Sequence, residues 1–143
     1  MFERLYRHQL DAKNRMRIPA KFRVELGTKY VITCGTGGCL FVFKEEAMEE
    51  LKRKLSKVSM FDKKKQDAIR FFLGHSWDAE EDGQGRILIP EELRSYAKFE
   101  KNIVCLKNLN WFELWNAEIW DKKMSETSFE DVADVLSGLD SDE

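Results

Sequence analysis

Two short stretches of this sequence place the same acid and the same base at the same spacing. Asp11 and Arg15 lie four positions apart, and Asp82 and Arg86 repeat that spacing 71 residues later. An aspartate in a turn can accept hydrogen bonds from nearby backbone amides and so fix the shape of the turn. An arginine just past the turn presents a planar fork of donors that suits phosphate groups and the O6 and N7 atoms of guanine. These residues therefore indicate recognition of phosphates or base edges.

A structural interpretation of the same residues stays open. Asp11 and Arg15 could simply pair and brace the turn, so that the repetition reflects the fold and not the function. Additional cations around the first copy, Lys13 and Arg17, favour contact with DNA there. The second copy is flanked by acids instead: Glu80, Glu81, Glu91 and Glu92. We therefore expect Arg86 to be the weaker contact or a structural residue.

The candidate DNA-binding residues belong to the two turns and to the starts of the strands that follow them. If the strand after the first turn begins early, its period of two puts every second side chain on one face. The candidates are Asp11, Lys13, Asn14, Arg15, Arg17, Asp82, Gln84 and Arg86. In this hypothesis Arg15 reads a guanine in the major groove, and phosphates are held by other cations. Those cations are Lys13, Arg17 and either Arg4 or Arg7.

Catalysis and metal binding are not indicated. The repeated aspartates could serve as acid–base groups, but no nucleophile–base pair, phosphate loop or metal cluster accompanies them. Three cysteines are an odd number for a disulfide framework. Cys34 and Cys105 occupy matching positions in apolar strand patterns, which predicts small buried thiols, and Cys39 has no counterpart. His8 and His75 lack ligand spacing. We predict no cofactor and no metal.

The elements that position the turns are repeated with them. Both copies read Asp-x-x-x-Arg-x-x-Ile-Pro, and two later apolar stretches of the first copy also recur in the second. Each unit is predicted as strand, turn, strand, helix, strand, strand. The predicted elements are a strand at 5–10, turns at 11–14 and 82–85, strands at 15–18 and 86–89, and helices at 19–26 and 90–96. Pro19 and Pro90 are expected at the first helical position.

Helices are also predicted between and after the repeats. Apolar residues at helical spacing indicate helices over 45–58, over 63–73 and from Phe129 onward, with Thr127 and Glu130 as a capping box. We divide the chain into four parts and expect an α+β fold. The parts are a first repeat at 5–50, a helical linker at 51–75, a second repeat at 76–122, and a C-terminal helix with an acidic tail at 123–143.

Charge is segregated along the 143 residues, although the net charge is only −2. Residues 1–30 hold eight Lys or Arg against three acids, and residues 116–143 hold two Lys against nine acids. A basic front of this kind suits a nucleic-acid partner better than the total charge suggests. No stretch resembles a signal peptide or a membrane span. We expect a cytoplasmic protein with reduced thiols and no membrane partner.

The paired motif resembles the MraZ family. The likeness extends from Phe2 to about Leu139 and includes His8-Gln9-Leu10-Asp11, Gly85-Arg86-Ile87-Leu88-Ile89-Pro90 and Glu113-Leu114-Trp115. The resemblance implies a tandem AbrB-like fold, in which the two halves interlace their hairpins into one pseudo-twofold barrel. Asn14 stands where the family usually has glycine, and asparagine is the best substitute in a left-handed conformation. Glu81 stands where an apolar residue is common.

The resemblance also implies a function. MraZ proteins regulate transcription of the division and cell wall gene cluster by binding short direct repeats upstream of their own gene, and they assemble into rings such as octamers. Their DNA-reading residues correspond here to Asp11 with Arg15 and Asp82 with Arg86. The expected partners are thus double-stranded DNA at the nucleoid and further copies of the chain. A ring-forming interaction scaffold without specific DNA readout is the alternative. Four aromatic residues are predicted mostly as core, with some as candidates for a ring interface: Trp111, Phe112, Trp115 and Trp120.

Overall fold

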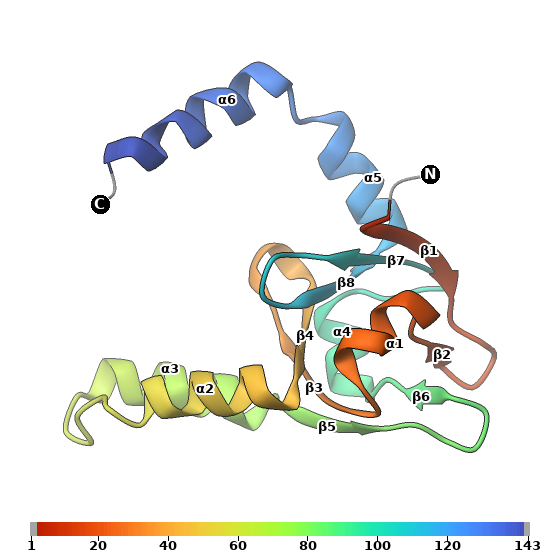
Figure 1. The fold of residues 1–143 in the computed structure, drawn as a ribbon, viewed down its shortest axis with the longest axis horizontal. Helices are drawn as coiled ribbons and strands as arrows, with labels where there is room; N and C mark the ends of the chain where they lie inside the picture. Colours follow the sequence, from red (N-terminus) through yellow and green to blue (C-terminus); the bar gives the residue numbers. More distant parts are fainter. Residues whose placement is uncertain (1–2, 142–143) are drawn as a thin grey trace.

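The protein, seen in a computed structural model, has a mixed α+β fold whose described residues are 3–141 (Figure 1). Both repeats have the predicted order of elements. The first contains β1 (Leu5–Gln9), β2 (Arg15–Arg17), α1 (Ala20–Leu26), β3 (Lys29–Cys34), the short 3-10 helix η1 (Thr36–Gly38) and β4 (Leu40–Lys44). The second contains β5 (Trp77–Glu80), β6 (Arg86–Leu88), α4 (Glu91–Tyr96), β7 (Asn102–Lys107) and β8 (Phe112–Asn116).

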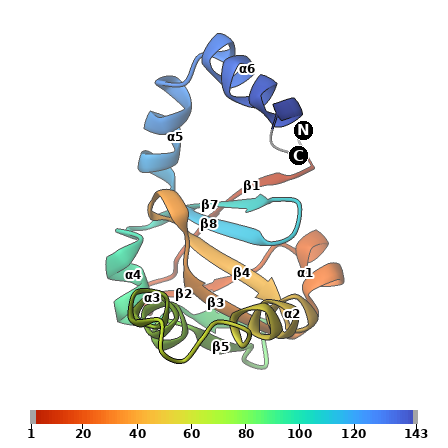
Figure 2. The ribbon, with the colours of Figure 1, turned by 90° about the vertical axis from the view of Figure 1, so that its left-hand side faces the viewer.

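Four longer helices and a terminal turn lie outside these units. They are α2 (Glu45–Leu55), α3 (Lys63–Gly74), α5 (Ala117–Ser125), α6 (Phe129–Ser137) and the 3-10 helix η2 (Gly138–Ser141). The helices α2 and α3 form an arm that projects from the sheet, and α5 and α6 leave the opposite side of the β7–β8 hairpin (Figures 1 and 2). No helix within residues 3–141 is long and apolar enough to cross a membrane.

Strand pairing joins the two repeats through β1–β7, β2–β6, β3–β5 and β4–β8. A six-stranded antiparallel sheet has the order β1-β7-β8-β4-β3-β5, and a separate two-stranded sheet pairs β2 with β6. Replacing each strand by its counterpart in the other repeat and reading the order backwards gives the same order, so the sheet has a pseudo-twofold relation. Because β1 pairs with β7 and β3 pairs with β5, neither repeat completes the sheet alone. This arrangement agrees with the small core that one unit of this size could bury.

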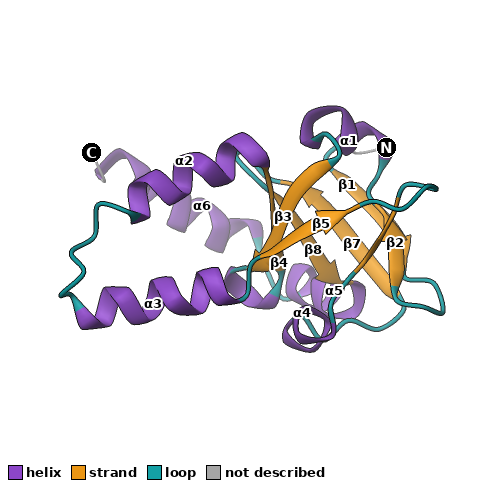
Figure 3. Cartoon of the chain, turned by 90° about the horizontal axis from the view of Figure 1, so that it is seen from below, coloured by secondary structure: helices purple, strands orange, loops and turns teal. Residues whose placement is uncertain are grey.

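The main core lies between the two-stranded sheet, the six-stranded sheet and the short helices α1 and α4 (Figure 3). Met16 and Ile87 face each other across β2 and β6 and are almost completely buried. Phe22 and Leu93 bring α1 and α4 into the same cluster. Burial of apolar surface on this scale is the main force that closes the fold. Of the four aromatic residues predicted mostly as core, Phe112 and Trp115 are buried, and Trp111 and Trp120 are half-buried against smaller clusters.

Several predicted boundaries are wrong by one to three residues. Pro19 and Pro90 precede their helices as N-cap residues, because their ψ angles of 136° and 148° remain extended. Each proline carbonyl still accepts the first hydrogen bond of its helix. The helix predicted to reach residue 58 ends at Leu55. Ser128, and not Thr127, caps α6 by accepting a hydrogen bond from the backbone N–H of Asp131.

Candidate nucleic-acid interface

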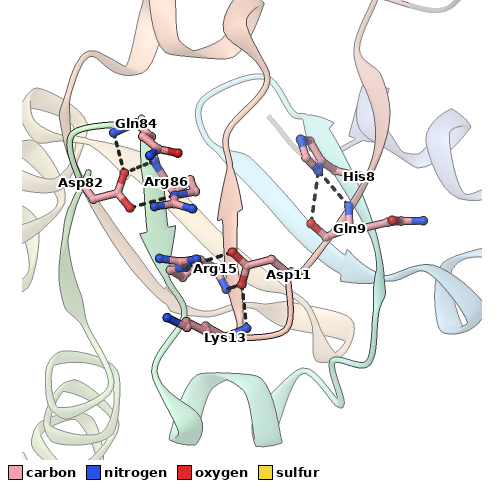
Figure 4. Close-up of polar contacts among 8 residues, drawn as sticks. All are labelled: His8, Gln9, Asp11, Lys13, Arg15, Asp82, Gln84 and Arg86. Atoms are coloured by element: carbon pink, nitrogen blue, oxygen red, sulfur yellow. Dashed lines mark hydrogen bonds and ion pairs between the residues drawn. The ribbon is translucent and has the colours of Figure 1, made fainter.

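The first turn is organised by the carboxylate of Asp11 (Figure 4). Its Oδ1 atom accepts hydrogen bonds from the backbone N–H groups of Lys13 and Arg15, both at 2.9 Å. Its Oδ2 atom accepts a hydrogen bond from Nε of Arg15, also at 2.9 Å. The backbone closes the same turn, because the N–H of Asp11 donates to the carbonyl of Arg15. One side chain thus fixes both the turn and the direction of the arginine that follows it.

The second turn reproduces this geometry. Asp82 Oδ1 accepts from the backbone N–H groups of Gln84 at 2.8 Å and Arg86 at 3.0 Å, and Oδ2 accepts from Nε of Arg86 at 2.9 Å (Figure 4). Side-chain exposure also matches: 27% for Arg15 and 26% for Arg86. The geometry of the turns therefore gives no reason for Arg86 to be the weaker contact. Any difference between the copies must come from their surroundings.

Both turns need a residue in the left-handed backbone conformation just before the arginine. Gly85 has φ of 76°, and Asn14 has φ of 61°. Glycine adopts this conformation without steric cost, and asparagine is among the few other residues that visit it. Asn14 therefore keeps the turn that the sequence suggested, and its carbonyl accepts a hydrogen bond from the N–H of Ile89 in the second repeat.

The interpretation that the motif braces its own turn is correct, because each aspartate forms an ion pair with the arginine four residues later. Only Nε of each guanidinium takes part. Among residues 3–141, no hydrogen bond is formed by the Nη1 or Nη2 atoms of Arg15 or Arg86. The aspartate therefore orients the side chain and leaves the two terminal nitrogens available for forked recognition of a ligand. Bracing the turn and contacting a ligand are compatible roles.

Arg15 and Arg86 share the outward face of the β2–β6 ribbon. Arg15 lies opposite Leu88, and Arg17 lies opposite Arg86, across an antiparallel register. Side chains alternate between the faces of a strand, and the inward positions, Met16 and Ile87, are the buried ones described above. The outward face is thus composed of four side chains from both repeats: Arg15, Arg17, Arg86 and Leu88.

This pairing decides two points that the sequence left open. The strands on either side of each turn do not form a hairpin with each other, because β1 pairs with β7 and β2 pairs with β6. Lys13 lies in the turn and not on a strand face, because β2 begins only at Arg15. Leu88 was missed as a member of the face. It is the counterpart of Arg17 at the offset of 71 residues, so alignment of the two copies could have pointed to it.

Glu81 is engaged in a contact between the repeats. Its carboxylate accepts two hydrogen bonds from Arg23, from Nε at 2.9 Å and from Nη2 at 2.6 Å, and a third from the Tyr30 hydroxyl at 3.2 Å. The Glu81 side chain is only 7% exposed. Burial, and next the nearby carboxylate, raise the pKa of Tyr30. Arg23 therefore compensates the acid beside the second turn.

Two other cations proposed as phosphate contacts also have partners. Arg7 forms a two-point ion pair with Asp121 of α5, with its shorter contact at 2.6 Å. Arg4 donates from Nη1 to the carbonyls of Lys107 and Asn108. Neither belongs to the ribbon face. Arg7 and Arg23 of the basic front are thus paired with acids of other elements, whereas Lys13 lies in the first turn and Arg15 and Arg17 lie on β2.

The cysteines are isolated thiols. All three are buried and free, and burial raises the pKa of Cys39 and of Cys105 to about 12. Such thiols are poor nucleophiles and poor metal ligands at neutral pH because the thiolate is the reactive form. No group of three or more potential metal-ligating side chains occurs within the described part of the chain.

The fold and the site define a class of protein. It is a tandem-repeat α+β protein that presents a basic two-stranded ribbon next to two turns of the same geometry. Sequence comparison gives the family. The model of the family described as "MraZ protein, putative antitoxin-like" matches residues 1–71 and again 72–137. The chain belongs to the MraZ family, which confirms the resemblance noted in the sequence.

Curated relatives cover almost the whole chain. A protein of Thermoanaerobacter sp. (strain X514) is 42% identical over 136 residues, which cover 94% of this chain and 95% of the relative. One from Halothermothrix orenii is 39% identical over 141 residues, covering 97% and 99%. One from Lactiplantibacillus plantarum is 42% identical over 138 residues, covering 95% and 98%. All three are named "Transcriptional regulator MraZ". The family is thus one of transcriptional regulators and not of enzymes.

The geometry of the turns predicts how their aspartates titrate. The backbone N–H of Arg15 is the largest cause that holds the pKa of Asp11 below its ordinary value, and the N–H of Arg86 does the same for Asp82. A lowered pKa in the folded state stabilises the turn above the ordinary aspartate pKa. That stabilisation is lost as the pH falls through the lowered value.

We expect NMR titration of the carboxyl carbons to find both aspartates below the ordinary range. In Arg15→Ala the pKa of Asp11 should rise only part of the way, because the backbone donors remain, while Asp82 should not change. Arg86→Ala is the matched control with the reverse pattern. An Asp11 that titrates at its ordinary pKa in the wild type would mean that the turn is not formed in solution.

Proposed function

We propose that this protein is a sequence-specific DNA-binding transcriptional regulator whose β2–β6 ribbon enters the major groove. The observation that best supports this proposal is the outward face of the ribbon, which displays three arginines and one leucine, while the inner face is buried. A two-stranded ribbon has dimensions that the major groove admits. Its rigidity is supported by Met16 and Ile87, which anchor the ribbon in the core.

The proposed roles follow from the contacts of each residue. Arg15 and Arg86 read base edges, with guanine O6 and N7 as the acceptors that fit their forks. Asp11 and Asp82 hold those arginines in position, and Asn14 provides the left-handed turn of the first copy. Lys13 and Arg17 contact phosphates, which fix the register of the protein on the duplex. Gln84 occupies the position of Lys13 in the second turn and supplies a neutral polar contact there.

The wider biological setting is proposed from the family. The regulated genes are those of the division and cell wall cluster, and the target is a set of short direct repeats upstream of the protein's own gene. The protein acts in the cytoplasm at the nucleoid, as a ring of identical chains such as an octamer. One ribbon binds weakly, and a ring that presents many ribbons gains affinity through effective concentration. Repeats spaced by about 10 base pairs would present the same face to each ribbon.

The architecture and domain limits are likewise proposals. The cross-repeat pairing supports a swapped-hairpin barrel of the AbrB-like kind, with repeats at 5–50 and 76–122 and a helical linker at 51–75. The segment 123–143 then forms the C-terminal helix and acidic tail. A ring-forming scaffold without DNA readout is the competing function, and the exposed helices outside the barrel make it worth testing. DNA binding by the ribbon separates the two.

Arginine substitutions on the ribbon test DNA readout. Arg15→Ala should lower affinity for the protein's own promoter by roughly ten- to a hundredfold, the usual loss for a bidentate base contact. Arg86→Ala should cost less, because Lys13 reinforces the first turn and neutral Gln84 occupies the second. Gel shifts with promoter and scrambled DNA measure both. Lys122→Ala, which removes an exposed cation from α5, is the control and should bind normally. Equal losses for the two arginines would contradict the proposed inequality, and no loss for either would contradict the function.

Salt dependence tests the phosphate contacts. Binding should weaken steeply with salt, with a slope of log affinity against log salt of about −0.9 for each phosphate neutralised. Lys13→Ala and Arg17→Ala should each reduce that slope by about one unit while leaving the preference among sequences nearly unchanged. Fluorescence anisotropy across a salt series provides the measurement. An affinity that is the same at low and high salt would contradict a phosphate-based interface.

A further inference from the structure

The helix α6 has an apolar face that nothing in the described chain covers. Its large apolar side chains, with one from η2, are mostly exposed: Phe129 at 78%, Val135 at 75%, Leu136 at 54% and Leu139 at 63%. None of the hydrophobic clusters among the described residues includes an α6 residue. A helix of nine residues is marginal by itself in water. This helix therefore needs a surface to pack against.

The same helix is strongly acidic. Residues 126–143 contain seven acids and no Lys or Arg, and Glu130, Asp131 and Asp134 lie within α6 itself. A partner surface should therefore combine exposed apolar side chains with positive charge, since apolar burial and charge complementarity together select a partner.

The α2–α3 arm, residues 45–74, has such a surface at its free end. Residues 52–70 contain eight Lys or Arg and two Asp. Met60 and Phe61, in the connection between the two helices, are 77% and 89% exposed. The ion pairs within the arm, such as Lys63 with Asp67 at 3.0 Å, are exposed and therefore weak. The arm projects well away from the sheet (Figure 3).

Within one chain, α6 and the arm are held apart. Figures 1 and 2 place them on opposite sides of the β7–β8 hairpin. The helix α5, which carries α6, is fixed by the Arg7–Asp121 ion pair and by Ile119 and Trp120, which pack against a buried cluster. Only residues 126–128 connect α5 to α6. These restraints favour an arm that belongs to another molecule.

We propose that α6 of one copy docks on the α2–α3 arm of a second copy. The acids of α6 face the cations of the arm, and the apolar stripe of α6 covers Met60 and Phe61. Such a contact joins two different surfaces, so it repeats head to tail and closes into a ring or continues as a filament. The inference rests on the proposed assembly into a ring and assigns the surfaces that make it.

Charge reversal with rescue tests this contact. One variant carries Lys63→Glu, Lys64→Glu and Lys65→Glu in the first turn of α3, where negative charge suits the helix dipole. A second carries Asp134→Lys and Ser137→Lys near the end of α6, where positive charge suits it. Each should raise the concentration of half-assembly by at least about tenfold, as measured by light scattering and native mass spectrometry. All five changes in one chain should restore assembly.

Two more variants and one parallel measurement complete the test. Leu136→Asp should also prevent assembly, and Lys122→Glu, outside both surfaces, should not. Circular dichroism verifies that each variant is folded. Wild-type assembly in both charge variants, or no rescue in the combined chain, would overturn the docking. Promoter binding is measured separately. A wild-type protein that assembles but does not bind its promoter would contradict the proposed function and not the docking.

A second inference comes from the register of the ribbon. Leu88 is 51% exposed on the outward face, directly opposite Arg15 and in the position that Arg17 occupies in the other repeat. Leu88 lies among three arginines, where its apolar side chain can form no polar contact, and it is not part of the hydrophobic core. In the major groove the apolar feature of a base pair is the 5-methyl group of thymine. We infer that Leu88 contacts a thymine methyl group next to the base read by Arg15.

Replacing thymine by deoxyuridine removes that methyl group alone. Single replacements across the promoter repeat should reveal one position where wild-type affinity falls about fourfold, the effect of one methyl group. Leu88→Ala should bind thymine and deoxyuridine equally there, while Leu109→Ala, an exposed leucine on the β7–β8 loop, should still discriminate. Persistent discrimination by Leu88→Ala, or no sensitive position for the wild type, would overturn this inference. Failure of the wild type to bind the promoter would instead overturn the proposed function.

Discussion

The structure depends most on a carboxylate that holds an arginine by its Nε atom. Asp11 satisfies two backbone donors with one oxygen and Arg15 with the other, and Asp82 repeats this for Arg86. The conformational entropy of each arginine side chain is therefore lost during folding and not when a ligand binds. The terminal nitrogens of each guanidinium form no hydrogen bond among residues 3–141 and stay available to a ligand. The same three hydrogen bonds give the turn its shape and the site its geometry.

Cross-repeat pairing places the two turns in a fixed relation. Because β2 pairs only with β6, the arginines of both repeats share one short ribbon, and the buried pair Met16 and Ile87 holds that ribbon on the core. The two turns have the same geometry, but the residues around them differ. Leu88 replaces the cation present at Arg17, and Glu81 requires Arg23 as a partner. A duplicated unit has thus diverged on its surface while keeping its hydrogen bonds.

Net charge conceals how this chain distributes its electrostatics. The value of −2 combines a basic ribbon, a basic arm and an acidic C-terminal segment that lie at separate places on the fold. Segregated charge of this kind can steer two different partners to two different surfaces. The cations near the start of the chain do not all contribute positive charge to the ribbon, because Arg7 and Arg23 are paired with acids of other elements.

The sequence alone determined the repeat, the order of its elements, both turns and the aspartate–arginine pairs. These features depend on residues a few positions apart, whose hydrogen bonds and backbone preferences are local. Tertiary structure decided that the strands beside each turn pair across the repeats, that Leu88 joins the arginines, and that Arg7 and Arg23 are occupied. Those outcomes require strand register and partners 58 to 114 residues away. They follow from burial of a shared core, which no local pattern encodes.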